Sequence, residues 1–375
     1  MRFDSIVVGL GATGSATLAH LARAGQRVLG IDRFAPPHDR GSSHGETRIY
    51  RQAYYEAPEY VPLALRALEL WHELEQETRR TLFIRTGALT IGPEHGELVS
   101  GALASARQHD IPHQVLDARD VPSRFPAFRP PPDTVTLFEP TAGVLFPERC
   151  IASHLEVAKK HGAEILSDVE VTDVGVGPNS VTVTVATGLY RAERIVVAAG
   201  AWLPKLLGMD SAFRVTREVV HWFHPRTSIA QAPACPVSMI AHDDGPILYT
   251  LPDVGGGLKA GLHHAGAAAD PNLHDAHVTA AERERVGTLV ERFIPGGAGP
   301  VVRSAPCYYT TSPDHHFVIG PLARSPRIIV ASACSGHGFK FASALGESIA
   351  LLARNKPAPL LPALFSPERL GTAKS

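Results

Sequence analysis

Residues 4–33 constrain the fold more than any other stretch, because they read as a strand, a glycine turn, a helix and a second strand. The apolar run at 6–8 is typical of a strand that is buried on both faces. Apolar residues with helical spacing follow over 13–24, and Gly25 is a natural C-terminal stop. A second apolar strand covers 28–31. The stretch therefore predicts a β-α-β unit at the start of the chain.

Three glycines in this unit, Gly9, Gly11 and Gly14, form a Gly-x-Gly-x-x-Gly pattern. Such glycines allow a tight turn and let a pyrophosphate approach the helix N-terminus, where free N–H groups and the helix dipole favour anions. Asp32 follows about twenty residues later, where an acid can accept hydrogen bonds from a ribose. We therefore predict a dinucleotide site, with NAD and FAD both open at this point. The alternative is a glycine turn in an ordinary β-α-β unit.

Length and composition narrow the class of protein. A chain of 375 residues suggests two domains or one elaborated domain, and a net charge of −1 gives no indication of nucleic acid or an anionic membrane. No apolar run approaches the length of a membrane span, and the N-terminus enters a strand without room for a signal peptide. The cysteines contain no Cys-x-x-Cys pair, which suits a reducing compartment; they are Cys150, Cys235, Cys307 and Cys334. We expect a cytoplasmic protein.

A polar loop over 36–51 follows the β-α-β unit and is rich in basic residues. They are His38, Arg40, His44, Arg48 and Arg51. Such a loop could face phosphates or an anionic substrate, and it could equally be solvated.

Periodicity predicts the remaining elements. The expected helices are 58–79, 96–109, 147–161, 279–293 and 339–354. The expected strands are 82–92 (one strand or a hairpin), 164–166, 169–175, 180–185, 194–200 and 327–332, with an antiparallel sheet over 215–265. The proline-rich stretch 122–132 predicts a loop or a crossover between domains.

The order of these elements indicates an α/β fold with two interleaved domains. Segments typical of a nucleotide-binding sheet occur at the start, in the middle and at the end of the chain, with antiparallel insertions between them. We predict a discontinuous Rossmann-like FAD-binding domain with a parallel sheet, over 1–82, 142–214 and 305–370. A largely antiparallel substrate domain covers 83–141 and 215–304. This layout favours FAD, because an NAD dehydrogenase more often keeps its nucleotide domain contiguous.

Several blocks of the sequence together resemble the monomeric sarcosine oxidase and N-methyltryptophan oxidase family, which are FAD-dependent amine oxidoreductases of the D-amino-acid-oxidase-like superfamily. They occur in the same order from the first strand to about residue 350. The blocks are GSSHGETRIYRQAY (41–54), YVPLALRALELW (60–71), GVLFPERC (143–150), GLKAGLHH (257–264), CYYTTSPDHHFVIG (307–320) and SGHGFKFASALGE (335–347).

The resemblance implies a monomeric flavoenzyme that acts on a small secondary amino acid and O2. Hydride equivalents would pass from the N-methyl carbon to the flavin, and the imine would hydrolyse to formaldehyde and the amino acid. Dioxygen would then be reduced to hydrogen peroxide.

The resemblance also implies roles for residues. Cys307 stands where the family attaches FAD through a thioether, although a lone cysteine is also a common core residue. The other residues expected to bind FAD are Gly9, Gly11, Ala12, Thr13, Gly14, Asp32, Arg33, Ser43, Thr47, Val171, Gly200, Trp202, Gly336, Gly338, Phe339 and Lys340.

The expected catalytic residues are Lys259, Arg48, His44, His263 and Tyr309, and the expected substrate-binding residues are Arg51, Lys340, Tyr249 and Ile240. Arg51 and Lys340 would bind the substrate carboxylate, which a guanidinium and an ammonium can both pair. The alternatives are surface charge for these two cations and a packed core aromatic for Tyr309. No general base is obvious.

The adjacent histidines His263 and His264 could suggest a metal, but no third ligand lies at a suitable spacing, and we expect none. Gly320 stands where these relatives lead us to expect an aspartate.

The size of the substrate depends on the side chains that wall its site in the predicted antiparallel sheet. We expect Ile240, Leu248, Ala260 and Leu262 to bear on it. An oxidase of a bulkier or cyclic amine (N-methyltryptophan, pipecolate or a sugar–amino acid adduct) therefore stays open. So do an FAD dehydrogenase with another electron acceptor and a non-catalytic flavin-binding protein.

Overall fold

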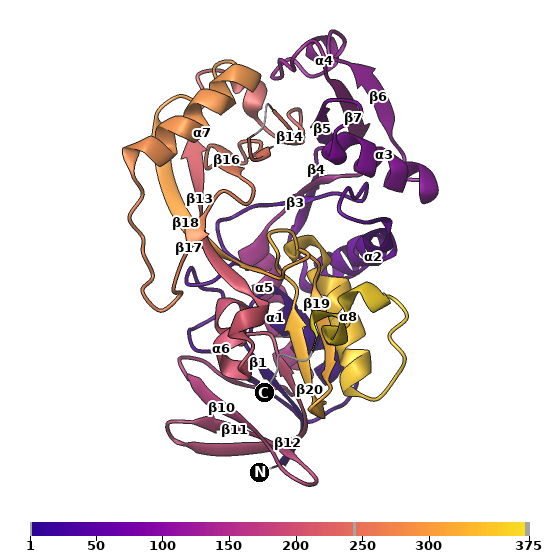
Figure 1. Ribbon diagram of the computed structural model, residues 1–375, viewed down its shortest axis with the longest axis vertical. Helices are drawn as coiled ribbons and strands as arrows, with labels where there is room; N and C mark the ends of the chain where they lie inside the picture. Colours follow the sequence, from indigo (N-terminus) through magenta and orange to yellow (C-terminus); the bar gives the residue numbers. More distant parts are fainter. Residues whose placement is uncertain (1, 243–244, 372–375) are drawn as a thin grey trace.

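The computed structural model describes residues 2–242 and 245–371 (Figure 1). Its α-helices are α1 (Ala12–Arg23), α2 (Val61–Thr78), α3 (Glu97–Gln108), α4 (Val121–Arg124), α5 (Pro147–Lys160), α6 (Leu203–Leu207), α7 (Ala280–Phe293) and α8 (Ala342–Ala353). Short 3₁₀ turns include η1 (Pro58–Tyr60), η2 (Gly200–Trp202) and η5 (Phe339–Phe341).

The strands of these residues form three sheets. The first sheet holds β1 (Arg2–Val8), β2 (Val28–Ile31), β9 (Glu164–Leu166), β10 (Val171–Val176), β11 (Val181–Val185), β12 (Gly188–Val197), β19 (Val318–Leu322) and β20 (Ser325–Ser332). The second holds β5 (Ala88–Gly92), β6 (Gln114–Asp117), β7 (Val135–Glu139), β13 (Arg214–Phe223), β14 (Val237–Ile240), β15 (Leu248–Leu251), β16 (Leu258–Leu262), β17 (Ala267–Ala268) and β18 (Val301–Thr311). The third holds β3 (Arg48–Tyr50), β4 (Phe83–Arg85) and β8 (Gly143–Leu145).

The first sheet confirms the predicted parallel nucleotide sheet. Strand β1 pairs in parallel with β2 on one side and with β12 on the other, and β12 pairs in parallel with β20. Segments far apart in the sequence therefore lie side by side in the lower part of Figure 1. The alternating stretch 180–185 forms the middle strand of the antiparallel set β10-β11-β12, as its half-buried pattern predicts.

Hydrophobic packing covers both faces of this sheet. Val7 of β1 joins a core with helices α1, α2, α5 and α8, whereas Ile6 and Val8 face the core on the opposite side. Helices α1 and α8 approach closely at Gly346, where a Cβ would lie 2.5 Å from the Ala16 side chain.

The second sheet is largely antiparallel, as predicted, and α7 packs against one face of it. The prediction of one strand or a hairpin over 82–92 is wrong, because two strands form there and they do not pair with each other. Strand β4 pairs with β8 and β5 pairs with β7 and β14, so the two strands belong to different sheets. Gly87, with φ of +75°, lies between them and redirects the chain. The expected loop at 122–132 begins with the single helical turn α4.

The bounds of the two domains stay a prediction. Strand β18 pairs along β13 and runs through the predicted boundary at 304/305. Among the described residues, no helix is both long and apolar enough to cross a membrane.

Candidate active site

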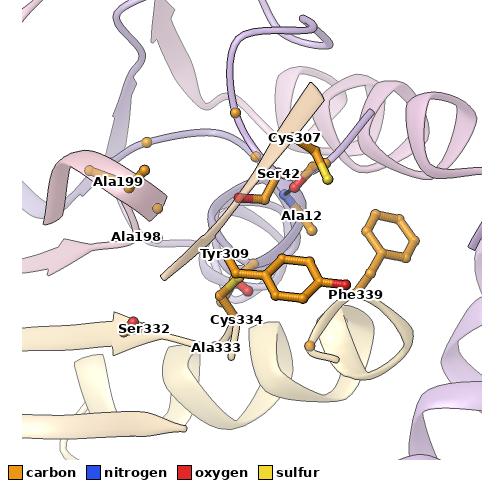
Figure 2. A pocket seen from close by; sticks show the side chains of 18 of the residues that line it. Ala12, Ser42, Ala198, Ala199, Cys307, Tyr309, Ser332, Ala333, Cys334 and Phe339 are labelled. Atoms are coloured by element: carbon orange, nitrogen blue, oxygen red, sulfur yellow. Dashed lines mark hydrogen bonds between the residues drawn. The ribbon is translucent and has the colours of Figure 1, made fainter. Parts of the chain in front are cut away.

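A cavity of about 600 Å³ extends from the start of α1 to the facing strands of the second sheet. Figure 2 shows part of its wall, with Ala12, Ser42, Cys307, Tyr309, Cys334 and Phe339 among the labelled residues. Both sheets therefore contribute to one site.

The glycine turn after β1 forms one end of the cavity. Gly9 has φ of +87°, and a Cβ there would lie 2.5 Å from the Ala198 carbonyl oxygen, so only glycine fits. Gly11 stands at the N-cap of α1 without a side chain, and the first turn carries no acidic residue. The backbone N–H of Ala12 donates to Ser43 Oγ at 3.2 Å. This end suits an anionic group, because it combines a helix N-terminus with close backbone access.

Asp32 lies beside this turn and is buried. Its carboxylate accepts the N–H of Leu10 at 2.6 Å and that of Phe34 at 2.9 Å. These two bonds fix the carboxylate at the cavity wall and leave further lone pairs for hydroxyl donors.

The other end of the cavity carries a buried lysine. Lys259 of β16 is 2% exposed, and its Nζ donates to the carbonyl oxygens of Gly45 and Thr47, each at 2.8 Å. Burial lowers the pKa of Lys259, and the neighbouring Arg48 lowers it further. The two carbonyl acceptors act in the opposite direction, because they stabilise the ammonium. Arg48 itself donates to the Thr47 and Ser42 carbonyls, each at 2.8 Å.

Two further cations, Arg51 and Lys340, line the same cavity and are both buried. Arg51 forms a two-oxygen contact with Glu56, at 2.8 and 2.9 Å, and its guanidinium lies 4.2 Å from the Tyr54 ring centroid. Lys340 Nζ donates to the His337 carbonyl at 2.8 Å and to Tyr54 Oη at 3.4 Å. Burial lowers the pKa of Lys340 to about 7, with Arg51 as the next cause. Both Arg51 and Lys340 thus contact Tyr54, the first at its ring and the second at its hydroxyl.

Neutral polar groups form the wall between these cations. His263 Nδ1 and Tyr309 Oη lie 3.3 Å apart. Burial lowers the pKa of His263 and raises that of Tyr309. Burial likewise raises the pKa of Tyr249 well above its usual value. A Cβ on Gly336 would lie 2.4 Å from the Tyr309 ring, so this wall depends on glycine. These side chains remain uncharged near neutral pH.

Cys307 faces the cavity from β18, two residues before Tyr309 (Figure 2). Its thiol is free and buried, and burial raises its pKa, with Arg48 and Lys259 acting in the opposite direction.

The structure brings most of the predicted site residues to this one cavity, with three exceptions: His44, Gly14 and Ile240. His44 is buried, and burial, followed by the charge of Arg48, lowers its pKa to about 4. Gly14 packs α1 against the turn, since a Cβ there would lie 1.8 Å from the Gly9 carbonyl oxygen.

Ile240 does not line the cavity because of strand parity. Side chains alternate across a strand, so Met239, Tyr249 and Leu251 face the cavity. Ile240 pairs with Leu248 in the adjacent register position and faces the core under α7. The expectation that Leu248, Ala260 and Leu262 bear on substrate size fails for the same reason, because all three lie in that core.

Other cavity residues were missed by the sequence reasoning. They include Glu56, His337, Met239 and Leu251. His337 stands between Gly336 and Gly338, both predicted to bind the cofactor, and this position in the loop is the sequence feature that points to the site. Glu56 carries no such signal, because a single acid after a polar loop is ordinary.

Among the described residues, no group of three or more His, Cys, Asp and Glu side chains is arranged to hold a metal ion.

Comparison with known proteins agrees with this geometry. The family model described as FAD dependent oxidoreductase matches residues 4–352. The chain is 38% identical to a monomeric sarcosine oxidase of Streptomyces avermitilis, over 99% of this chain and 98% of the relative. It is 36% identical to an N-methyl-L-tryptophan oxidase of Yersinia pestis, over 98% and 99%. The solved structure of NikD, an unusual amino acid oxidase essential for nikkomycin biosynthesis, superposes with a TM-score of 0.85 at 24% identity, over 98% of this chain and 97% of that one.

Proposed function

The chain belongs to the family of FAD-dependent oxidoreductases, and we propose that it is an oxidase of a small N-methyl amino acid of the sarcosine type. The proposed reaction converts the N-methyl amino acid, O2 and water into the demethylated amino acid, formaldehyde and hydrogen peroxide. The names of the relatives support an amine substrate, and the buried cations of the cavity support one that carries a carboxylate.

The observation that carries this proposal is the pair of buried cations, Arg51 and Lys340, on the wall of the cavity. Buried cations are costly unless they are paired. Arg51 has Glu56 as its partner, whereas the acceptors of Lys340 are a carbonyl and a hydroxyl. A substrate carboxylate would supply Lys340 with a counter-charge, and its amine would then lie towards the middle of the cavity.

The cavity suits FAD on features of this chain. The start of α1 and the close-packed Gly9 would hold the pyrophosphate, and Asp32 would accept hydrogen bonds from the ribose. Among the described residues, Thr47 Oγ1 is buried without a hydrogen-bond partner, and Thr47 lines the cavity. A polar ligand in this part of the cavity would satisfy that atom.

Cys307 would hold the flavin covalently through Sγ. The support is its position, since it faces the cavity from β18, two residues before Tyr309, and is close enough to Arg48 and Lys259 for their charges to lower its pKa.

The protein residues would prepare the substrate. FAD, when bound, supplies the acceptor for hydride equivalents. Arg51 and Lys340 would orient the substrate, while His263, Tyr249 and Tyr309 enclose it. Six arginine and lysine residues line the cavity, so the substrate amine would lose its extra proton more readily than in water. A neutral amine is the form that can be oxidised without a dedicated base.

Lys259 would serve the oxygen half of the reaction. Its ammonium lies in a buried position where charge acts strongly, so it would stabilise negative charge that develops on dioxygen.

A substrate panel tests the proposed function. The purified protein is mixed anaerobically with sarcosine, N-methyltryptophan, pipecolate and a sugar–amino acid adduct, and flavin bleaching is followed. Peroxide is then measured in air. We expect fastest bleaching with sarcosine, and stoichiometric peroxide. Bleaching by none of the amines would contradict catalysis, and bleaching without peroxide would indicate a dehydrogenase.

A further inference from the structure

The turn at Gly45, Glu46 and Thr47 connects two charged groups that do not touch. Gly45 has φ of +94° and Glu46 has φ of +65°, so two consecutive residues adopt the left-handed region. The positive φ makes glycine the suitable residue at position 45, and a Cβ there would lie in ordinary van der Waals contact with Lys259 Nζ, at 3.4 Å. The N–H of Thr47 donates back to the Gly45 carbonyl at 2.7 Å.

Lys259 binds one side of this turn through the carbonyls of Gly45 and Thr47. An ammonium has three N–H donors, so these two bonds leave one donor for the cavity that Lys259 lines. The Nζ atom also lies 5.1 Å from the Trp222 ring centroid, and this aromatic face favours a cation.

Glu148 binds the other side of the turn. It stands in the first turn of α5, and its Oε1 accepts the N–H of Gly45 at 2.6 Å and that of Glu46 at 3.0 Å. Its second oxygen lies 3.2 Å from the Glu46 nitrogen.

The two contacts share one peptide group. The carbonyl of Gly45 and the N–H of Glu46 belong to the same peptide bond, so Lys259 donates to one end of it and Glu148 accepts from the other. A carboxylate on the N–H polarises the peptide and makes its carbonyl a stronger acceptor. The charges of Lys259 and Glu148 are therefore linked through a peptide.

We propose that Glu148 is a positioning residue that keeps Lys259 an ammonium, with its remaining N–H available in the cavity, by binding the turn at 45–47. The proposal rests on the proposed function of Lys259. It adds a second requirement, because the lysine must remain charged although it is buried.

Other charged groups near Lys259 set the background. Burial and then the charge of Arg48 disfavour the ammonium, whereas Cys307, Glu148 and Glu46 favour it. Glu46 forms an ion pair with Arg303, whose guanidinium lies 3.9 Å from the Trp222 ring centroid. Glu148 is thus a carboxylate that reaches Lys259 through a hydrogen-bonded peptide.

Glu148→Gln tests the link, because it keeps a hydrogen-bond acceptor and removes the charge. We expect the rate of flavin reoxidation to fall about tenfold near neutral pH. We also expect the pH above which this rate declines to be lower than in the unaltered protein. The sign follows from the lysine, because a lower pKa means that the ammonium is lost earlier as the pH rises. The rate of anaerobic flavin reduction by substrate should change less than about twofold, because Arg51 and Lys340, which would bind the substrate carboxylate, are unaltered.

Glu75→Gln is the matched control. Glu75 of α2 accepts two backbone N–H groups, of Leu82 at 2.7 Å and Phe83 at 3.0 Å, and it does not line the cavity. The Glu75→Gln substitution removes the same kind of contact between a carboxylate and the backbone, so a general loss of stability would affect both variants. Glu148→Asp keeps the charge and should recover most of the reoxidation rate.

A second readout does not depend on turnover. The chain has seven lysines, so the ammonium signals of ¹⁵N-labelled lysine can be resolved by NMR. The signal that is absent from the spectrum of Lys259→Met is assigned to Lys259. We expect the Lys259 signal to disappear at lower pH in Glu148→Gln than in the unaltered protein and in Glu75→Gln.

The outcomes separate the proposals. An unchanged Lys259 titration in Glu148→Gln, or equal losses in both half-reactions that Glu148→Asp does not recover, would overturn the role of Glu148. If Lys259→Met leaves reoxidation unchanged while Glu148→Gln still shifts the Lys259 signal, the peptide link is upheld and the proposed oxygen role of Lys259 fails.

Discussion

Raising the pH should weaken the binding of simple carboxylates, because Lys340 must carry a proton to attract an anion. Burial and the adjacent Arg51 lower the pKa of Lys340 to about 7. Below that pH the ammonium is present, and above it the ammonium is lost. Three nearby groups do not titrate in the same window, since the pKa values of His263 and His337 are held well below 6.5 and that of Tyr54 well above 10.0.

The size of the effect follows from this pKa. If only the protonated enzyme binds the anion, the apparent Kd rises about 90-fold between about pH 6 and about pH 9, until the pKa of the complex is reached. That change corresponds to about 2.7 kcal/mol of binding free energy. Acetate is a suitable probe because its own charge is constant over this range.

The assay follows the flavin absorption spectrum during titration with acetate at a series of pH values. Lys340→Met should bind acetate weakly at every pH and show no titration near 7. Lys259→Met should retain the dependence, which separates the two buried lysines of the cavity. A constant apparent Kd in the unaltered protein, or a dependence that survives in Lys340→Met, would refute the reasoning.

Three further predictions concern the same cavity. Flavin fluorescence should stay with the polypeptide on a denaturing gel and be released in Cys307→Ala; free flavin from the unaltered protein would contradict covalent attachment. Arg51→Ala or Lys340→Ala should each raise carboxylate inhibition constants about 10- to 100-fold, because each removes charge-assisted hydrogen bonds of roughly 1.5–3 kcal/mol; unchanged constants in both would exclude the clamp. Lys259→Met should slow reoxidation by orders of magnitude and substrate reduction much less in stopped flow; equal effects would remove its special role in the oxygen step.

The nucleotide-binding part of the fold was predictable because its signals are local. Strands β1, β12 and β20 each contain a short buried apolar run, at 6–8, 195–197 and 328–331, and the first run is followed by glycines at fixed spacing. The partner of a strand is not local information. Residues 82–92 carry strand patterns on both sides of Gly87, but β4 pairs with β8 and β5 pairs with β7, and both partners lie far along the chain, at 143–145 and 135–139.

Site residues divide in a similar way. Cations such as Arg51 and Lys340 could be found from their motifs. The alternation of β14 shows that Met239 and Ile240 face opposite sides, but it does not reveal which side meets the cavity. Glu148 is a common residue type for the first turn of a helix, so only the hydrogen bonds to Gly45 and Glu46 distinguish it.

The pairing of β1, β12 and β20 has a consequence for synthesis of the protein. Ile195 pairs with Ile328, and the loop that carries Gly336, His337 and Lys340 follows β20 directly. A ribosome must therefore synthesise the chain beyond residue 340 before the cavity has all its walls. Contacts over such sequence separations form slowly. We expect the cofactor to be acquired only after β20 and the loop that follows it have been synthesised, and a nascent chain halted before β20 to retain none.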